Sequence, residues 1–151
     1  MARASSGPYE ALPNSGWLHF EDHVKAGLAR QGFAIQEIVR INRQEFDVVT
    51  VRDGVVWNVQ CKNNFVELDR VDSDAVAFAR YNSGLVRAYE KALAKEAKRE
   101  QLLKDKLAID DVQHMVVSRF PVVTDNPRIV VFSRISSFAK RADEILATGR
   151  D

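Results

Sequence analysis

The sequence predicts an α/β fold in which helices flank one mixed β-sheet. Runs rich in β-branched and aromatic residues occur in both halves of the chain, and segments with helical periodicity lie before, between and after them. The expected order is helix, three strands, helix, two strands, helix (αβββαββα). The chain has 151 residues, and a domain of this size buries roughly 68–70% of its unfolded surface in one core. We therefore expect residues 1–14 to form a flexible N-terminal arm and residues 15–151 to form a single domain.

The first expected element is an amphipathic helix over residues 15–31. Its apolar residues recur at the spacing of one helix face: Trp17, Phe20, Val24 and Leu28. Ser15 is suited to cap the N-terminus, and Gly32 is suited to end the helix. The apolar stripe of this helix is expected to be buried.

Three strands are expected next, at residues 33–41, 45–52 and 55–62, where β-branched and aromatic residues are frequent. The short connections between these runs favour consecutive antiparallel strands. Asp53-Gly54 between the last two runs is typical of a type I′ turn, because both central positions of that turn need a positive φ.

A long charged segment separates these strands from the rest of the sheet. Residues 72–107 are rich in Lys, Glu, Ala and Leu and predict helix, with a break at Gly84 or at Asn82-Ser83. The remaining elements are expected to be strands at 112–119 and 128–134 and a closing helix at 137–147.

Composition excludes several functional classes. Lys and Arg number 22 against 21 Asp and Glu, with a net charge of +1, so any contact with nucleic acid must come from a local patch. The longest apolar run is Ala75–Ala79, far shorter than the roughly 20 residues of a membrane-spanning helix. A lone cysteine, Cys61, fits a reducing compartment. We expect a cytoplasmic protein that does not enter membranes.

The hairpin around Asp53-Gly54 gathers polar side chains on one face. Counting back from a two-residue loop puts Asp47 opposite Gln60 and Glu45 opposite Lys62. The other face receives apolar residues that are expected in the core: Phe46, Val48, Trp57, Val59 and Cys61. Opposed residues have Cβ atoms roughly 4.5–5.5 Å apart, so the Asp47 carboxylate and the Gln60 carbonyl oxygen can reach one metal ion.

The first helix contributes a further acid, Glu21. On a helical wheel it lies within roughly 60° of the apolar stripe. A carboxylate near the core is costly unless it is paired or binds a metal. A divalent ion held by Glu21, Asp47 and Gln60 would meet that need, and oxygen ligands favour Mg²⁺ or Mn²⁺.

These residues resemble a known family, the PD-(D/E)xK (restriction-endonuclease-like) nucleases. Gln60-Cys61-Lys62 looks most like the motif of the Mrr-type restriction endonucleases, and Phe20-Glu21 is similar to a pair in archaeal Holliday-junction resolvases. The resemblance covers roughly residues 15–135, including the order of elements. It departs from the family motif in Gln60, which replaces an acid, and in Phe46, which stands where the motif has proline.

The resemblance implies a fold, an activity and a set of roles. The fold would be a restriction-endonuclease-like core, and the activity a divalent-metal-dependent DNA endonuclease that hydrolyses phosphodiester bonds. Asp47 and Glu21 would bind Mg²⁺ (or Mn²⁺), Gln60 would supply an oxygen ligand, and Lys62 would position or activate the attacking water. Glu45 is a candidate accessory acid.

Alternatives remain open from the sequence. The same fold could serve as a catalytically silent module that binds nucleic acid or a protein partner, with Gln60 marking a weakened metal site. Glu45 and Lys62 could be a cross-strand ion pair, and Glu21 could pair with Lys25 on the helix.

The sequence also indicates candidate contacts with DNA and with a second copy of this chain. Asn63, Asn64 and Lys25 are candidate nucleic-acid contacts, the first two because their loop follows the motif. The cations of the long helix could track a phosphate backbone, although its acids favour a solvated face. A homodimer is a further expectation, with a seam along that helix composed of Leu85, Tyr89, Leu93, Leu102 and Leu107.

Overall fold

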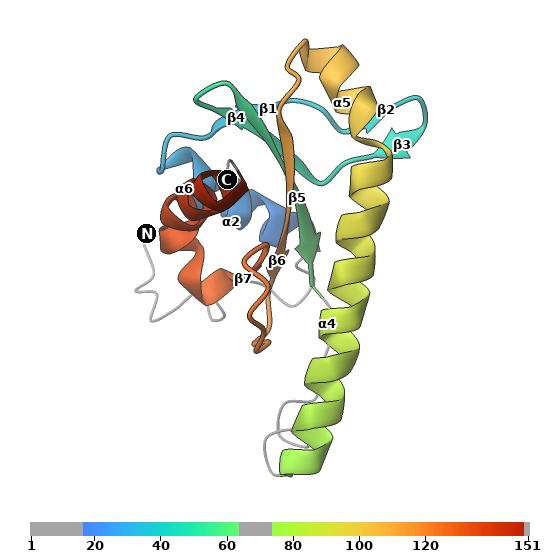
Figure 1. Cartoon of the computed structure of the whole chain (residues 1–151), viewed down its shortest axis with the longest axis vertical. Coiled ribbons are helices and arrows are strands. Elements are labelled where there is room, and N and C mark those ends of the chain that lie inside the picture. The colour runs from blue at the N-terminus through green and yellow to red at the C-terminus, as the bar shows by residue number, and fades with distance from the viewer. Residues whose placement is uncertain (1–16, 64–73, 150–151) are drawn as a thin grey trace.

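The computed structural model describes residues 17–63 and 74–149 (Figure 1). It is a mixed α/β structure around a five-stranded sheet with the order β1-β4-β5-β6-β7. The strands are β1 (Ala34–Gln36), β4 (Val48–Arg52), β5 (Val55–Lys62), β6 (Val112–Ser118) and β7 (Ile129–Val131). β1, β4 and β5 pair antiparallel, whereas β5, β6 and β7 pair parallel. The expected α/β class and mixed sheet are confirmed; the expected arm at residues 1–14 and the Ser15 cap lie outside the described residues.

Helices cover both faces of this sheet (Figure 1). On one face, α2 (Trp17–Ala29) and α6 (Phe138–Gly149) pack through Phe20, Leu28 and Phe138 against Trp57. On the other face lie α4 (Ala75–Lys98) and α5 (Glu100–Leu107), which connect β5 to the parallel strand β6. α4 is long enough to run past the end of the sheet (Figure 1). The site considered below lies on the α4 side.

The central hairpin forms as the sequence predicts. Arg52 pairs with Val55 and Val49 with Asn58, and Asp53 and Gly54 have φ values of 52° and 77°. These are the positive values that a type I′ turn requires. Strand β5 occupies the predicted range 55–62, with Trp57 and Cys61 turned to the α2 side.

The strands before this hairpin are shorter than expected. The predicted run 33–41 contains β1 and a separate two-residue strand, β2 (Arg40–Ile41), and the predicted run 45–52 is divided between β3 (Gln44–Glu45) and β4. β2 and β3 form their own two-stranded sheet, joined through Asn42 and Arg43 with φ of 50° and 69°. This small hairpin is not among the elements predicted from the sequence.

The break between β3 and β4 changes where Phe46 points. Phe46 packs with Val49 and Val56 in the cluster beneath α5, not with Val48 on the α2 side as predicted. The alternation of faces holds only along a continuous strand, and the chain leaves the strand at Phe46 and Asp47. The predicted side for Phe46 was therefore wrong.

Other boundaries also move. The long helical segment breaks at Arg99, not at Gly84 or Asn82-Ser83; Gly84 lies within a continuous α4. A glycine inside a helix costs only about 1 kcal/mol relative to alanine, which the packing of α4 offsets. β7 ends at Val131 and a 3₁₀ helix, η1 (Phe132–Ser137), occupies the rest of the predicted strand at 128–134.

The expected dimer seam is already used within the chain. Its residues pack against the sheet in two apolar clusters: Leu85, Tyr89 and Leu93 in one, Leu102 and Leu107 in the other. The prediction that these residues form a dimer seam is therefore wrong, while dimerisation itself stays a prediction.

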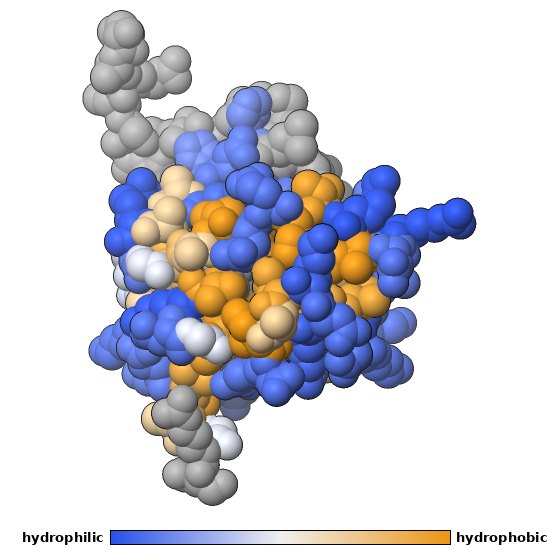
Figure 2. Space-filling model, turned by 90° about the horizontal axis from the view of Figure 1, so that it is seen from above, coloured by the Kyte–Doolittle hydropathy of each residue, from blue (hydrophilic) through white to orange (hydrophobic). Residues whose placement is uncertain are grey.

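Viewed from above, the molecule shows apolar side chains at the centre of this face with hydrophilic ones around them (Figure 2). None of the helices in the described part of the chain combines the length and apolarity of a membrane span.

Candidate functional site

A pocket of about 480 Å³ opens between the β2–β3 hairpin, the end of β5 and the C-terminal part of α4. Four residues singled out from the sequence line it together: Glu45, Asp47, Gln60 and Lys62. The predicted polar face of the hairpin is thus present as one concave surface. Three elements distant in sequence build it, and α4 supplies its far wall.

Asp47 lies just before β4, beside the end of β5. Its Oδ2 accepts a hydrogen bond of 2.8 Å from the backbone N–H of Cys61, which holds the carboxyl next to Gln60 as the predicted register requires. Burial raises the pKa of Asp47, while that hydrogen bond and the Lys62 ammonium oppose the rise. The site therefore holds a desolvated carboxyl with a cation close by.

Gln60 and Lys62 alternate with the core residues of β5. Val59 and Cys61 are fully buried on the α2 side, so Gln60 and Lys62 turn toward α4, where both are half-buried. The parallel neighbour β6 pairs Gln60 with Val116 and Lys62 with Ser118. The pairing of β5 with β4 ends at Val59, so the backbone under these two side chains is held by β6 and by the hydrogen bond from Cys61 to Asp47.

Glu21 approaches from the other layer. It is half-buried on α2 and does not line the pocket. Burial and the negative charge of Asp47 raise the pKa of Glu21 to about 7, and Lys25 opposes this rise. The two carboxyl groups are thus close enough to repel each other, although they stand on different elements.

A metal ion at this site would depend on few charged ligands. In the described residues, no three His, Cys, Asp or Glu side chains are grouped closely enough to hold a metal ion. The predicted donor set contains two carboxylates and one amide oxygen, all of the hard oxygen type that suits Mg²⁺ or Mn²⁺. The negative charge of Asp47 raises the pKa of Glu21, and a cation bound between two carboxylates would offset that charge, so the donor types present fit such an ion.

The remaining candidates have other partners. Glu45 accepts a 2.6 Å hydrogen bond from Arg40 across the β2–β3 hairpin, so its ion-pair partner is Arg40 and not Lys62. Asn63 Oδ1 accepts a 2.9 Å hydrogen bond from Arg119. This bond holds the Asn63 side chain beside the end of β6. Lys25 is half-buried one turn after Glu21, and Asn64 lies outside the described residues.

Glu96 also contributes to the pocket, although it is not among the site residues predicted from the sequence. This carboxylate is only 2% exposed and lines the pocket from α4. It accepts hydrogen bonds from Arg99, at 3.1 and 2.9 Å, and from the Asn58 amide at 2.8 Å. The sequence favours a solvated face for the acids of this helix; Glu96 departs from that expectation, and its spacing of three residues from Leu93 and seven from Tyr89 is the signal that places it on the buried face.

The Asn58 amide also connects to β6. It lies 3.2 Å from Nδ1 of His114, whose Nε2 lies 2.9 Å from Glu100. This buried polar chain links β5, β6, α4 and α5 behind the pocket. It joins the wall formed by Glu96 to the sheet.

Comparisons of this chain with protein-family models, with curated proteins and with solved structures find no match.

Proposed function

We propose that this protein is a divalent-metal-dependent DNA endonuclease with a restriction-endonuclease-like core. The observation that carries the proposal is that Asp47, Gln60 and Lys62 line one pocket. The repulsion between Glu21 and Asp47 supports it further. The strand order also agrees with it, since an antiparallel β1-β4-β5 unit is followed by a helical crossover to the parallel strand β6.

Each residue has a defined role in the proposed hydrolysis. Glu21, Asp47 and Gln60 would hold the ion. When bound, a divalent ion offsets the charge of the phosphodiester and makes an attacking water more acidic. Lys62 would hold that water in line with the phosphorus and stabilise negative charge as it develops on the phosphate oxygens.

The proposal is tested by incubating the protein with plasmid, linear and branched DNA in Mg²⁺ or Mn²⁺. Asp47→Asn and Lys62→Gln each remove one charge without a large change of shape. Each is expected to lower the cleavage rate by about 100-fold or more, as loss of a group that stabilises transition-state charge does.

Matched controls are Asp105→Asn and Lys140→Gln, because both side chains are exposed and lie away from the pocket. Their cleavage rates should equal that of the unaltered protein. Cleavage that persists in both Asp47→Asn and Lys62→Gln would contradict the assignment of the site.

One observation favours a second candidate, a nuclease-fold module that binds nucleic acid without cutting it. Gln60 stands where the family motif has an acid, which leaves the site with less negative charge for a metal. That candidate predicts DNA binding with no turnover in either metal. Gln60→Glu would then be the informative variant, because an added carboxylate should strengthen metal binding if the rest of the site is intact.

A further inference from the structure

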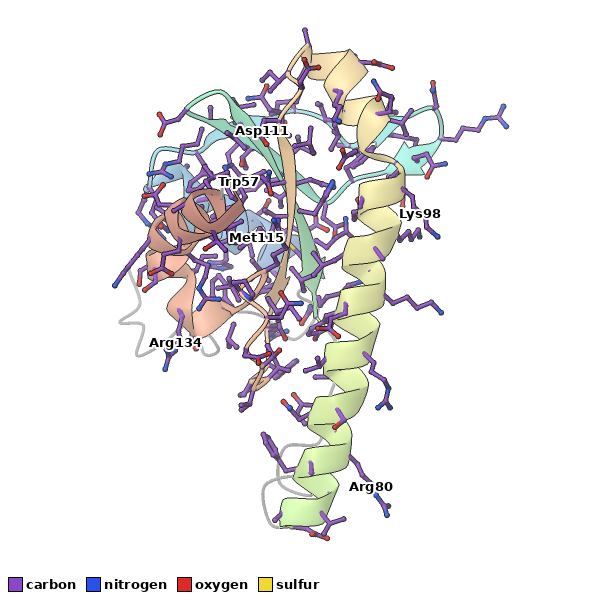
Figure 3. All side chains as sticks on the ribbon, viewed as in Figure 1. Trp57, Arg80, Lys98, Asp111, Met115 and Arg134 are labelled. Carbon is purple, nitrogen blue, oxygen red and sulfur yellow. The ribbon has the colours of Figure 1, made fainter. Side chains whose placement is uncertain are left out.

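The outer face of α4 carries a row of cations that the pocket does not account for. Arg80, Arg87, Lys91 and Lys98 are all exposed. At 100° per residue they lie within about 40° of one another on the helix. Figure 3 shows Arg80 and Lys98 on the same side of α4, pointing away from the sheet. We call these four residues the α4 cation row.

The acids of this region are turned elsewhere. Glu96 is buried against Asn58 and Arg99, and Glu90 accepts a hydrogen bond from Asn126 in the loop before β7. Glu100 contacts Lys104 and His114. Among the residues that the structure describes, no acid forms an ion pair with a member of the α4 cation row. Although acids and cations are similar in number in this segment, the outer face of α4 therefore carries positive charge.

The row is long and adjoins the pocket. From Arg80 to Lys98 it extends about 27 Å at 1.5 Å per residue. Lys95, also exposed, and Ala92 line both the pocket and a neighbouring shallow depression that Lys91 and Lys98 border. Cations spread along a line suit a line of phosphates better than a single anion, and the alanines between them let a backbone approach closely.

We propose that the α4 cation row binds the phosphate backbone of duplex DNA and lays it alongside the pocket. This inference rests on the proposed function, and it specifies how the substrate is held. Duplex DNA presents one negative charge per roughly 1.7 Å of axis, so it complements the row along its whole length. The contacts are to phosphates, and binding through them is independent of base sequence.

The test measures binding of a labelled DNA duplex by fluorescence anisotropy over a range of salt concentrations, in EDTA so that no cleavage occurs. The test variant replaces all four members of the row with Gln, a good helix former. Its affinity at 50 mM salt should fall by at least about 100-fold, and the slope of log K against log salt should flatten by about 3–4, close to 0.9 for each lost phosphate contact. Binding should return in part when Arg87 and Lys91 are restored.

The control variant removes the same number and kind of cations elsewhere: Arg30, Lys106, Arg134 and Lys140, all exposed and changed to Gln. Arg134 lies on the side of the molecule away from α4 (Figure 3). For the control variant, the slope of log K against log salt should change by less than about 1. Equal losses in the two variants, or no DNA binding by the unaltered protein, would overturn the proposal; in the latter case the row would suit an acidic protein.

The outcome is separable from that of the proposed function. If the unaltered protein cleaves DNA and the row variant binds DNA normally, the docking surface is wrong and the nuclease proposal stands. If DNA binds through the row but is not cleaved in Mg²⁺ or Mn²⁺, the docking surface stands and the nuclease proposal fails. Thermal melts of both variants should match that of the unaltered protein, because the replaced side chains are exposed.

Discussion

Glu21 lies on α2 between the fully buried Phe20 and the exposed Asp22, at the border of the core. Burial and the Asp47 carboxylate raise its pKa to about 7, from an ordinary value of 4.5. The folded protein therefore holds this proton more tightly than the unfolded chain does. Its contribution to stability is fully present below about pH 4.5 and is lost as the pH rises to about 7.

Glu21→Gln should stabilise the metal-free protein at pH 8 and change its stability little at pH 4.5, because Gln resembles the protonated acid. At pH 8 the melting temperature should rise by at least about 2 °C, the shift that about 1 kcal/mol causes in a protein of this size. Thermal melts at several pH values in EDTA measure this. The control is Glu144→Gln, an exposed acid on α6, and an equal gain at both pH values would count against the argument.

At the scale of elements, Arg99 joins the end of α4 to the β2–β3 hairpin. Its guanidinium contacts both oxygens of Glu96, donates to the Gln44 side chain at 3.1 Å and to the Glu45 carbonyl oxygen, and lies 4.2 Å from the centre of the Phe46 ring. One side chain thus fixes the wall of the pocket against the segment that carries Asp47.

Arg99→Leu should destabilise the protein by about 3–5 kcal/mol, because it leaves the Glu96 carboxylate buried without its partner. Urea unfolding measures the loss. Arg52→Leu is the matched control: it breaks a 2.8 Å ion pair with Asp143, a side chain that is 61% exposed, and should cost no more than about 1 kcal/mol through that pair. Similar costs for the two variants would show that Arg99 has no such role. Glu96→Gln combined with Arg99→Leu should recover part of the loss, because it removes the buried charge.

Elements with local signals were predictable from the sequence, and those that depend on distant contacts were not. The β4–β5 hairpin was predicted with its register because Asp53-Gly54 favours a positive φ at both turn positions. The β2–β3 hairpin was missed because Asn42-Arg43 has no such glycine, and part of its support comes from Arg99, more than fifty residues away. For the same reason the pocket's polar face was predicted from one hairpin, whereas the contributions of Glu96 on α4 and of Arg99, which follows α4, were not predicted.

At the scale of the whole molecule, the site joins the two layers that the sheet separates. Glu21 belongs to the layer of α2 and α6, whereas the pocket with Asp47 opens on the α4 side. The sheet holds these acids near each other in spite of their repulsion, which is relieved if both contact one cation. The near-zero net charge of the chain therefore does not describe its surface, because carboxylates and cations line the pocket together and the cation row occupies the outer face of α4.

Binding of Mn²⁺ should accordingly stabilise the entire fold, and more strongly at pH 8 than at pH 5.5. A ligand at 100 times its Kd stabilises a protein by about 2.7 kcal/mol. The pH dependence arises because the ion competes with protons for Glu21 and Asp47, whose pKa values are both raised. Thermal melts with and without Mn²⁺ measure the shift, with Asp47→Asn as the variant that should lose most of it and Asp105→Asn as the variant that should keep it. A shift of the same size in Asp47→Asn would mean that the ion binds elsewhere, whereas its loss in both Glu21→Gln and Asp47→Asn would show that the two layers share one ion.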